Sequence, residues 1–369
     1  MKSPSVSMNL ISPNSPEEMA EALHSAAQAG EPIRLGGAFS KDSMGGPLAP
    51  ASRVITTRAL SRVLQYEPKD LTISVEAGMR WRDLDTLLAA NRQMIPLDPW
   101  HEEATVGGVV AANISGPRRR LYGTARDAVI GMRFAMLDGK LATSGGMVVK
   151  NVAGLDIGKL MIGSYGTLAA LTSVNFKLVP KPEASRTFTF QHSTAKDAAR
   201  QAGAFLAGQL QPVALDIYKN GESRLLVQAA GSPALVARYE RDLRAAAMTE
   251  GAAEAEAWRA PRSLPFSAAA TVRVSCTLSE VGDVLEALPG PAVARAGNGV
   301  VYGAFDDWQA ATEWVKKARW TAVVESAPAD CPAEARWPNP GPALATMEKI
   351  KAMFDPKRLL NPGRLHGRI

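Results

Sequence analysis

The sequence predicts an α+β protein of two lobes: an N-terminal lobe in which strands and helices alternate, and a C-terminal lobe built on an antiparallel sheet. Three observations indicate this. Strand-like and helical runs alternate over roughly the first 100 residues. Glycine is unusually frequent between 107 and 166, with apolar runs between the glycines. After Val-Pro-Lys-Pro at 179–182 the chain becomes rich in alanine, and strand-like and helical runs alternate again.

The first expected element is a helix whose two ends are both marked in the sequence. Ser15 and Glu18 have the spacing of a capping box, and Pro16 suits the first helical position. Gly30 then ends the helical apolar pattern. The next elements are expected to be strands at 33–35, 54–56 and 72–75 and a helix at 81–90.

The glycine-rich segment contains short apolar runs, among them 109–112, 132–137 and 168–172. Glycine permits tight turns and a close approach of the backbone to another group. We therefore expect strands joined by tight turns in this segment, with backbone packed against a partner.

The second lobe is expected to be an antiparallel sheet with helices on one face. Its strands are expected at 186–191, 214–218, 224–228, 271–276 and 300–305. Its helices are expected at 195–206, 234–248, 279–288 and 308–318, and a last helix at 344–354 follows a proline-rich stretch. The sequence reveals no internal repeat.

Charge and composition exclude several classes of protein. The net charge is +6, but basic residues are scattered apart from Arg118, Arg119 and Arg120, and no nucleic-acid-binding module accompanies them. No run approaches the ~18 apolar residues of a membrane span, and the N-terminus lacks the apolar core of a signal peptide. Cys276 and Cys331 fit no disulfide, metal or redox spacing. We expect a protein of the cytoplasm, or of the cytoplasmic face of the inner membrane. An anionic cofactor, an acidic substrate or an acidic partner would account for the basic excess, and so would a solvated surface alone.

Three blocks containing glycine are candidate binding elements. The first, Arg-Leu-Gly-Gly-Ala-Phe-Ser at 34–40, follows a strand, and its glycines let backbone amides approach a diphosphate. It lacks the G-x-G-x-x-G of a Rossmann turn, and alone it is more typical of an ordinary tight turn. The second block runs from Ala104 to Asp127 and the third from Lys150 to Leu168. The informative feature is the order of the three blocks.

In this order the blocks resemble the FAD-binding domain of the vanillyl-alcohol oxidase/p-cresol methylhydroxylase (PCMH) family. The closing Asp-Pro-Lys-Arg-Leu-Leu-Asn-Pro-Gly at 355–363 resembles the end of the C-terminal lobe of the family's FAD-linked oxidases. Within the family, the whole chain is most similar to the FAD-binding subunits of three-part glycolate oxidases, on segments 98–101, 113–123 and 149–154.

The resemblance implies that the chain is divided into three parts. A PCMH-type FAD-binding domain of two α/β subdomains is expected over 1–182. An α+β substrate or cap lobe is expected over 183–340. The segment 341–369 is expected to form a helix and an Asn-Pro-Gly turn that return to the FAD-binding domain.

The resemblance also assigns residues to the cofactor. The expected diphosphate loop consists of Gly36, Gly37, Ala38, Phe39 and Ser40. The expected lining of the flavin and its ribityl chain consists of Pro99, Thr105, Val106, Gly107 and Gly108, continued by Asn113, Ser115, Gly116 and Gly123. Leu168 and Leu171 fall where the family packs main chain and an aliphatic side chain against flavin or adenine, although core packing explains these leucines equally well.

Two departures from the family pattern are informative. Members that tether their flavin often use a histidine in the first loop, and Phe39 occupies that position here, so the sequence predicts non-covalent FAD. Related D-2-hydroxy-acid dehydrogenases carry metal-ligating histidines around a Gly-Asp-Gly-Asn segment. The counterpart here, 296–302, has no histidine, and the 4 histidines of the chain are dispersed, so we expect no metal.

The resemblance implies oxidation of glycolate, a 2-hydroxy acid, to glyoxylate through FAD. The expected partners are a second flavoprotein subunit and an iron–sulfur subunit, with peripheral membrane association through that complex. A small carboxylate substrate would suit arginine, whose planar fork pairs with both oxygens. The candidate residues are Arg118, Arg119 and Arg120, then Arg259 and Arg262, with His101 or Lys150 as proton acceptor. Three alternatives stay open: structural roles for these residues, an electron-relay subunit without a substrate site, and a stand-alone FAD alcohol oxidase.

Overall fold

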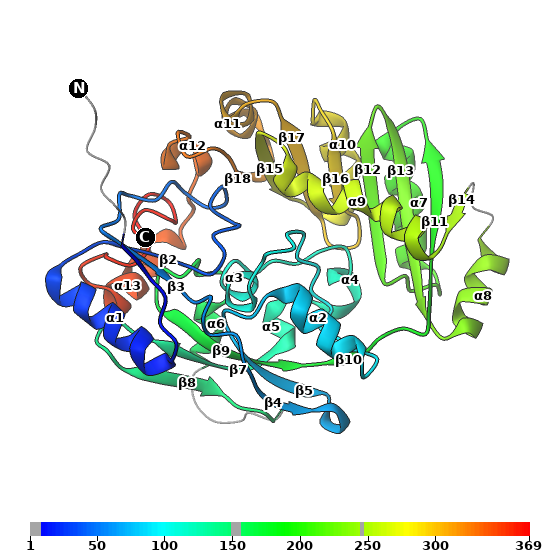
Figure 1. Ribbon diagram of the computed structural model, residues 1–369. Coiled ribbons are helices and arrows are strands. Elements are labelled where there is room, and N and C mark those ends of the chain that lie inside the picture. Colours follow the sequence, from blue (N-terminus) through cyan, green and yellow to red (C-terminus); the bar gives the residue numbers. More distant parts are fainter. Residues whose placement is uncertain (1–8, 149–155, 244–246) are drawn as a thin grey trace.

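Helix α1 (Pro16–Ala29) is the first helix of the first lobe in the computed structural model, which describes residues 9–148, 156–243 and 247–369 (Figure 1). Both expected ends are confirmed. The Ser15 hydroxyl accepts a hydrogen bond from the Glu18 amide, and Gly30 ends the helix with a φ of 67°. The buried face of α1, with Met19 and Leu23, packs on the neighbouring sheet.

Two main sheets and a small ribbon form the first lobe. The parallel sheet has the order β1 (Asn9–Ile11), β3 (Arg53–Thr56), β2 (Ile33–Gly36). The antiparallel sheet has the order β4 (Val63–Glu67), β5 (Thr72–Glu76), β9 (Ala170–Lys177), β7 (Val129–Ala135), β8 (Leu141–Gly145). The ribbon pairs β6 (Gln93–Met94) with β10 (Val179–Pro180). Helix α2 (Trp81–Ala89) buries Trp81, Leu84 and Leu88, as its sequence predicts.

The expectation of strands joined by turns in the glycine-rich segment is wrong in part. The run 109–112 lies at α3 (Val106–Ala111), and three short helices follow: α4 (Arg119–Tyr122), α5 (Ala125–Ala128) and α6 (Gly158–Met161). A short apolar run has no periodicity that separates strand from helix. The Thr105 hydroxyl, which accepts a hydrogen bond from the Gly108 amide, caps the start of α3. The strands expected at 132–137 and 168–172 correspond to β7 and to the start of β9.

The second lobe is an eight-stranded antiparallel sheet with the order β14-β11-β13-β12-β16-β17-β15-β18. Its first half consists of β11 (Ala184–His192), α7 (Ala195–Ala207), β12 (Ala214–Asn220), β13 (Glu222–Gly231), α8 (Pro233–Asp242) and β14 (Ala247–Thr249). Its second half consists of β15 (Ala270–Ser275), α10 (Val281–Ala287), β16 (Ala292–Arg295), β17 (Val300–Phe305), α11 (Trp308–Lys317) and β18 (Thr321–Ser326). Both halves are β-α-β-β-α-β units, a structural repeat that the sequence does not reveal.

Helices cover both faces of this sheet, which corrects the expectation of one covered face. Helices α7, α10 and α11 pack on one side, while α9 (Gly251–Ser267) lies on the other. Trp258 of α9 packs against Tyr218 and Val293 of the sheet. The sequence analysis missed α9 because Pro261 and Pro265 lie inside it, where proline normally breaks a helix.

The C-terminal segment returns to the first lobe. After α12 (Ala333–Arg336) and α13 (Leu344–Phe354), Leu360 pairs with Ile33 of β2. In Figure 1 the red C-terminal turns accordingly lie beside β2 and α1. Within the described ranges, no helix has both the length and the apolar character needed to cross a membrane.

Candidate cofactor-binding site

A cavity opens in the first lobe between the end of β2 and the start of α3. Its walls come from the loop after β2, from α3, from the segment before β9 and from the C-terminal tail. The residues assigned to the cofactor by sequence that line it are Gly36, Gly37, Ala38, Phe39, Ser40, Thr105, Gly107, Gly108 and Leu171. The structure thus brings together parts of the first two blocks that are far apart in the chain.

Two glycines are required by close packing around this cavity. A Cβ on Gly37 would lie 2.0 Å from Oγ1 of Thr105, a side chain with 1% exposure that caps α3. A Cβ on Gly107 would lie 2.9 Å from Cβ of Ala77. The backbone of the loop after β2 therefore packs directly against the Thr105 side chain, and the backbone at the start of α3 packs against Ala77. Both segments contribute backbone to the cavity wall.

Phe39 gives the loop its shape. Its backbone is left-handed, with a φ of 54°, and its ring lies over Gly36, where an added Cβ would be 2.6 Å away. The guanidinium of Arg34 lies 4.7 Å from the centre of the ring and forms an ion pair with Asp42. The position that carries a tethering histidine in some relatives is thus occupied by a ring that packs within the loop.

Two basic side chains at the cavity were missed by the sequence analysis. Lys41 is 8% exposed, and burial lowers the pKa of its ammonium to about 8. Arg364 is 5% exposed and donates to the carbonyl oxygens of Lys41 and Asp42. Burial also lowers the pKa of Arg364. The only sequence signal for Lys41 is its place directly after the glycine loop.

The Asn361 side chain braces the cavity from the C-terminal tail. Its Nδ2 donates to the carbonyl oxygens of Leu35 at 3.0 Å and Tyr165 at 2.8 Å, and its Oδ1 accepts from the Leu35 amide at 2.8 Å. The Asn-Pro-Gly motif therefore fixes the end of β2 relative to the turn before β9.

Several residues assigned to the cofactor by sequence do not line this cavity, and the assignments of all the cofactor residues stay predictions. They are Pro99, Val106, Asn113, Ser115, Gly116, Gly123 and Leu168. Val106 and Leu168 belong to the hydrophobic core. A Cβ on Gly116 would lie 2.3 Å from Cβ of Asp98, and Gly123 ends α4 with a φ of 79°. Lys150 and the rest of segment 149–155 lie outside the described residues.

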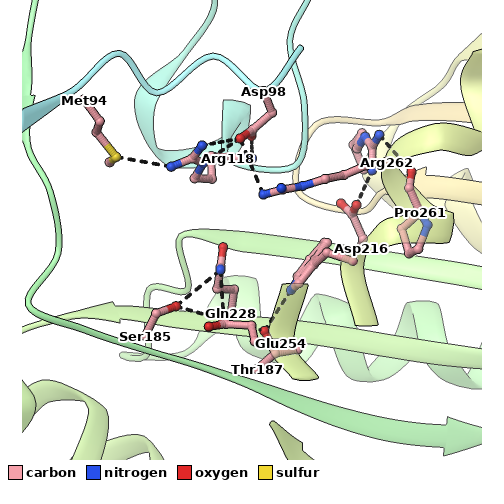
Figure 2. Close-up of polar contacts among 12 residues, drawn as sticks. Met94, Asp98, Arg118, Ser185, Thr187, Asp216, Gln228, Glu254, Pro261 and Arg262 are labelled. Carbon is pink, nitrogen blue, oxygen red and sulfur yellow. Dashed lines mark hydrogen bonds and ion pairs between the residues drawn. The ribbon is translucent and has the colours of Figure 1, made fainter. Parts of the chain in front are cut away.

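Arg118, a candidate for the substrate carboxylate, is bound to a buried aspartate (Figure 2). Its Nε donates to Oδ1 of Asp98 at 2.8 Å, its amide donates to Oδ2 at 3.2 Å, and its Nη1 contacts the sulfur of Met94 at 3.2 Å. Arg262 of α9 reaches the same carboxylate at 3.5 Å from the other lobe. Burial alone would raise the pKa of Asp98, but Arg118 and Arg262 hold it at about 2. The group joins the lobes, and the Arg118 guanidinium is engaged by Asp98 and Met94.

The other sequence candidates also contact protein groups. Arg120 donates to the Pro212 carbonyl oxygen at 2.8 Å and to Oε1 of Gln211 at 2.6 Å, again across the lobe boundary. Nδ1 of His101 accepts from the Glu103 amide at 3.2 Å, and His101 does not line the cavity. Arg259 is 75% exposed and pairs with Glu256 within α9.

A second polar group, on the other lobe, lies close to Tyr165 of the cavity wall. Arg273 on β15 is paired in register with Tyr302 on β17, and its Nε donates to Oε2 of Glu325 on β18 at 2.9 Å. Tyr165 lines the cavity with a left-handed φ of 53°. Burial raises the pKa of Tyr165, Glu325 raises it further, and Arg364 and Arg273 oppose the rise. The three strands thus carry charged and phenolic groups close to Tyr165 of the cavity wall.

The cavity fits an anionic dinucleotide such as FAD. It combines backbone that admits no Cβ, a glycine loop at a strand end and a buried ammonium. In the parts of the chain that the structure describes, no three His, Cys, Asp or Glu side chains gather as metal ligands.

Comparisons with known proteins agree with this fit. The FAD binding domain family matches residues 9–145, and the C-terminal domain of FAD linked oxidases matches 334–365. The chain is 27% identical over 366 residues to glycolate oxidase subunit GlcE of Escherichia coli, covering 96% of this chain and 98% of that protein.

Further relatives match a smaller part. Glycolate oxidase subunit GlcD of Bacillus subtilis is 28% identical over 56% of this chain and 44% of its own length. The mitochondrial D-lactate dehydrogenase (cytochrome) of Arabidopsis thaliana is 32% identical over 60% of this chain and 39% of its own length. Among solved structures, an alkyldihydroxyacetonephosphate synthase has a TM-score of 0.69 at 17% identity, covering 96% of this chain and 75% of that one. That likeness concerns the fold.

Proposed function

We propose that the chain is an FAD-linked oxidoreductase of the PCMH type that oxidises a 2-hydroxy acid, with glycolate as the leading substrate, using FAD held without a covalent bond. The observation that carries the proposal is the cavity, whose glycine loop, buried lysine and α3 backbone fit the cofactor beside polar groups of the second lobe. Phe39 supports the absence of a tether, because its ring offers no nucleophile. FAD, when bound, accepts the hydride equivalent from the carbon that carries the hydroxyl.

Anaerobic addition of glycolate to the isolated, flavin-loaded chain is expected to bleach the flavin absorbance near its visible maximum. Two control substrates accompany glycolate: D-lactate, which keeps the carboxylate, and a simple alcohol, which lacks it. Bleaching by the alcohol alone would contradict the assignment of a 2-hydroxy acid.

We place the substrate carboxylate at Arg273, with Tyr302 and Tyr165 beside it. Arg273 uses its Nε for Glu325, and Nη1 makes only a 3.4 Å contact with the Ser275 hydroxyl. Neither phenol makes a hydrogen bond with any residue that the structure describes. Arg273 and Tyr302 lie on β15 and β17 close to Tyr165 of the cavity wall, and arginine with two hydroxyls is a suitable donor set for a carboxylate.

Arg273→Met is expected to raise the KM for glycolate roughly 10- to 100-fold, because a charge-assisted hydrogen bond is lost. Steady-state kinetics with an artificial electron acceptor measures this. Arg238→Met, at an exposed arginine paired within α8, is the matched control and should leave KM unchanged. An unchanged KM in Arg273→Met would place the carboxylate elsewhere.

One observation favours a second function, electron relay without a substrate site. Both arginines first considered for the carboxylate, Arg118 and Arg120, are held by protein groups between the lobes. In that case substrate would leave the flavin oxidised, while a partner flavoprotein would reduce it.

We further propose that the chain works in a complex. The full-length relative is a glycolate oxidase subunit, and GlcD is another subunit of that name. A second flavoprotein and an iron–sulfur subunit are the proposed partners, and the cytoplasmic face of the inner membrane is the proposed location. Affinity purification of the tagged chain from its own cells should recover both subunits.

A further inference from the structure

Lys41 is a buried cation in the cofactor cavity. The residue is 8% exposed, and its ammonium makes a 3.3 Å hydrogen bond to the Ser40 hydroxyl. No carboxylate among the described residues lies within ion-pairing distance of it. Asp42, the next residue along the chain, pairs with Arg34 instead. Burying an ammonium without a counter-charge is costly, so its surroundings favour the binding of an anion.

The surroundings of the ammonium point to the same ligand. Nζ of Lys41 lies 3.6 Å from the point where a Cβ of Gly108 would be, beside the start of α3. Arg364 adds a second positive charge nearby, but its guanidinium donates to the Lys41 and Asp42 carbonyl oxygens. Two positive side chains therefore converge on a cavity wall, which suits a group that carries more than one negative charge.

We propose that Lys41 binds the diphosphate of FAD directly, and that the cofactor-free protein is less stable because this charge is buried without a partner. The diphosphate is charged whether the flavin is oxidised or reduced, so it is a permanent counter-charge. The glycine loop that Lys41 follows provides backbone to the same wall. The inference rests on FAD binding and is independent of the substrate proposed above.

Proton binding is expected to accompany cofactor binding. Burial alone lowers the pKa of Lys41 to about 8; Arg34, Asp42 and Arg364, the charged groups packed around it, contribute no resolved shift. A bound diphosphate would raise this pKa again. Above pH 8 the protein must therefore take up a proton to bind FAD, and its affinity for FAD should fall as the pH rises toward 10.

The same pKa sets the sign of the effect on stability. The folded, cofactor-free protein holds the proton of Lys41 less tightly than the unfolded chain does. The destabilisation is therefore complete below pH 8 and disappears as the pH rises toward the ordinary value of 10.5.

The test compares Lys41→Met with Lys41→Arg, using FAD and ADP as probes. ADP carries the diphosphate without the flavin. Lys41→Met should weaken both ligands about 10- to 100-fold, while Lys41→Arg should retain most of the affinity. Thermal unfolding of cofactor-free Lys41→Met at pH 7 should occur at a higher temperature than in the wild type. Lys140→Met, at a 76% exposed lysine paired with Asp138, is the control and should change neither quantity.

Two results would overturn the proposal. Unchanged ADP affinity together with a shifted flavin midpoint potential would place Lys41 at the flavin ring. A lower unfolding temperature of cofactor-free Lys41→Met would show that the lysine supports the fold. Neither result depends on whether glycolate is oxidised.

Discussion

Gly37→Ala is expected to lower the affinity of the protein for FAD roughly 5- to 150-fold, because the new Cβ forces an overlap that costs about 1–3 kcal/mol. The Cβ would lie 2.0 Å from Oγ1 of Thr105 and 2.9 Å from its Cβ and Cγ2. Thr105 is buried, is branched at Cβ and caps α3, so it has no free rotamer to adopt. The loop after β2 must move instead, and it forms the cavity wall. Flavin fluorescence quenching measures the affinity.

Two further variants separate this mechanism from general damage. Gly203→Ala lies in α7, where a new Cβ meets nothing within 4 Å, and should leave FAD binding intact. Thr105→Ala removes Oγ1 and Cγ2, so it should recover part of the affinity when combined with Gly37→Ala. A double variant no better than Gly37→Ala would mean that the overlap with Thr105 is not the cause.

The sequence predicted local elements well and their spatial assembly less well. Ser15 and Gly30 mark α1 because capping groups act within one helical turn. Helix α9 was missed because Pro261 and Pro265 oppose it locally, while the burial of Trp258 against the sheet stabilises it. The sequence did not reveal the repeat in the second lobe, because many different sequences can form the same order of strands and helices.

The glycines of the cofactor site were predicted from the sequence, but its charged residues were not. Gly37 and Gly107 leave a signature because close packing demands that residue type. Lys41 and Arg273 are single basic residues among many, and only the fold shows that Lys41 is buried at the cavity and that Arg273 lies close to Tyr165 of the cavity wall. Conversely, the Arg118 to Arg120 run attracted attention by clustering, yet Asp98 and the second lobe bind Arg118 and Arg120.

Lys351→Met is expected to lower the free energy of unfolding by about 3–5 kcal/mol, the usual effect of removing one partner from a buried ion pair. Lys351 is 0% exposed, and its ammonium donates to Oδ2 of Asp355 at 2.7 Å. It also donates to the carbonyl oxygens of Thr167 at 2.7 Å and Leu360 at 2.8 Å. One side chain thus joins α13, the turn before β9 and the tail residue Leu360, which pairs with Ile33 of β2. Urea unfolding followed by circular dichroism measures the loss.

Lys351→Met should also lower the affinity for FAD, because Leu360 directly precedes the Asn361 that braces the cavity. Lys317→Met, which removes an exposed i,i+4 pair with Glu313, is the matched control and should cost less than about 1 kcal/mol. Adding Asp355→Asn to Lys351→Met should cost little more, since the carboxylate is then already unpaired. If Lys351→Met were as mild as the control, the C-terminal tail would be held mainly by the Asn361 hydrogen bonds and the Leu360 bridge. A loss of FAD affinity in Lys351→Met that accompanies the loss of stability would instead show that the buried ammonium stabilises the cavity through the C-terminal tail.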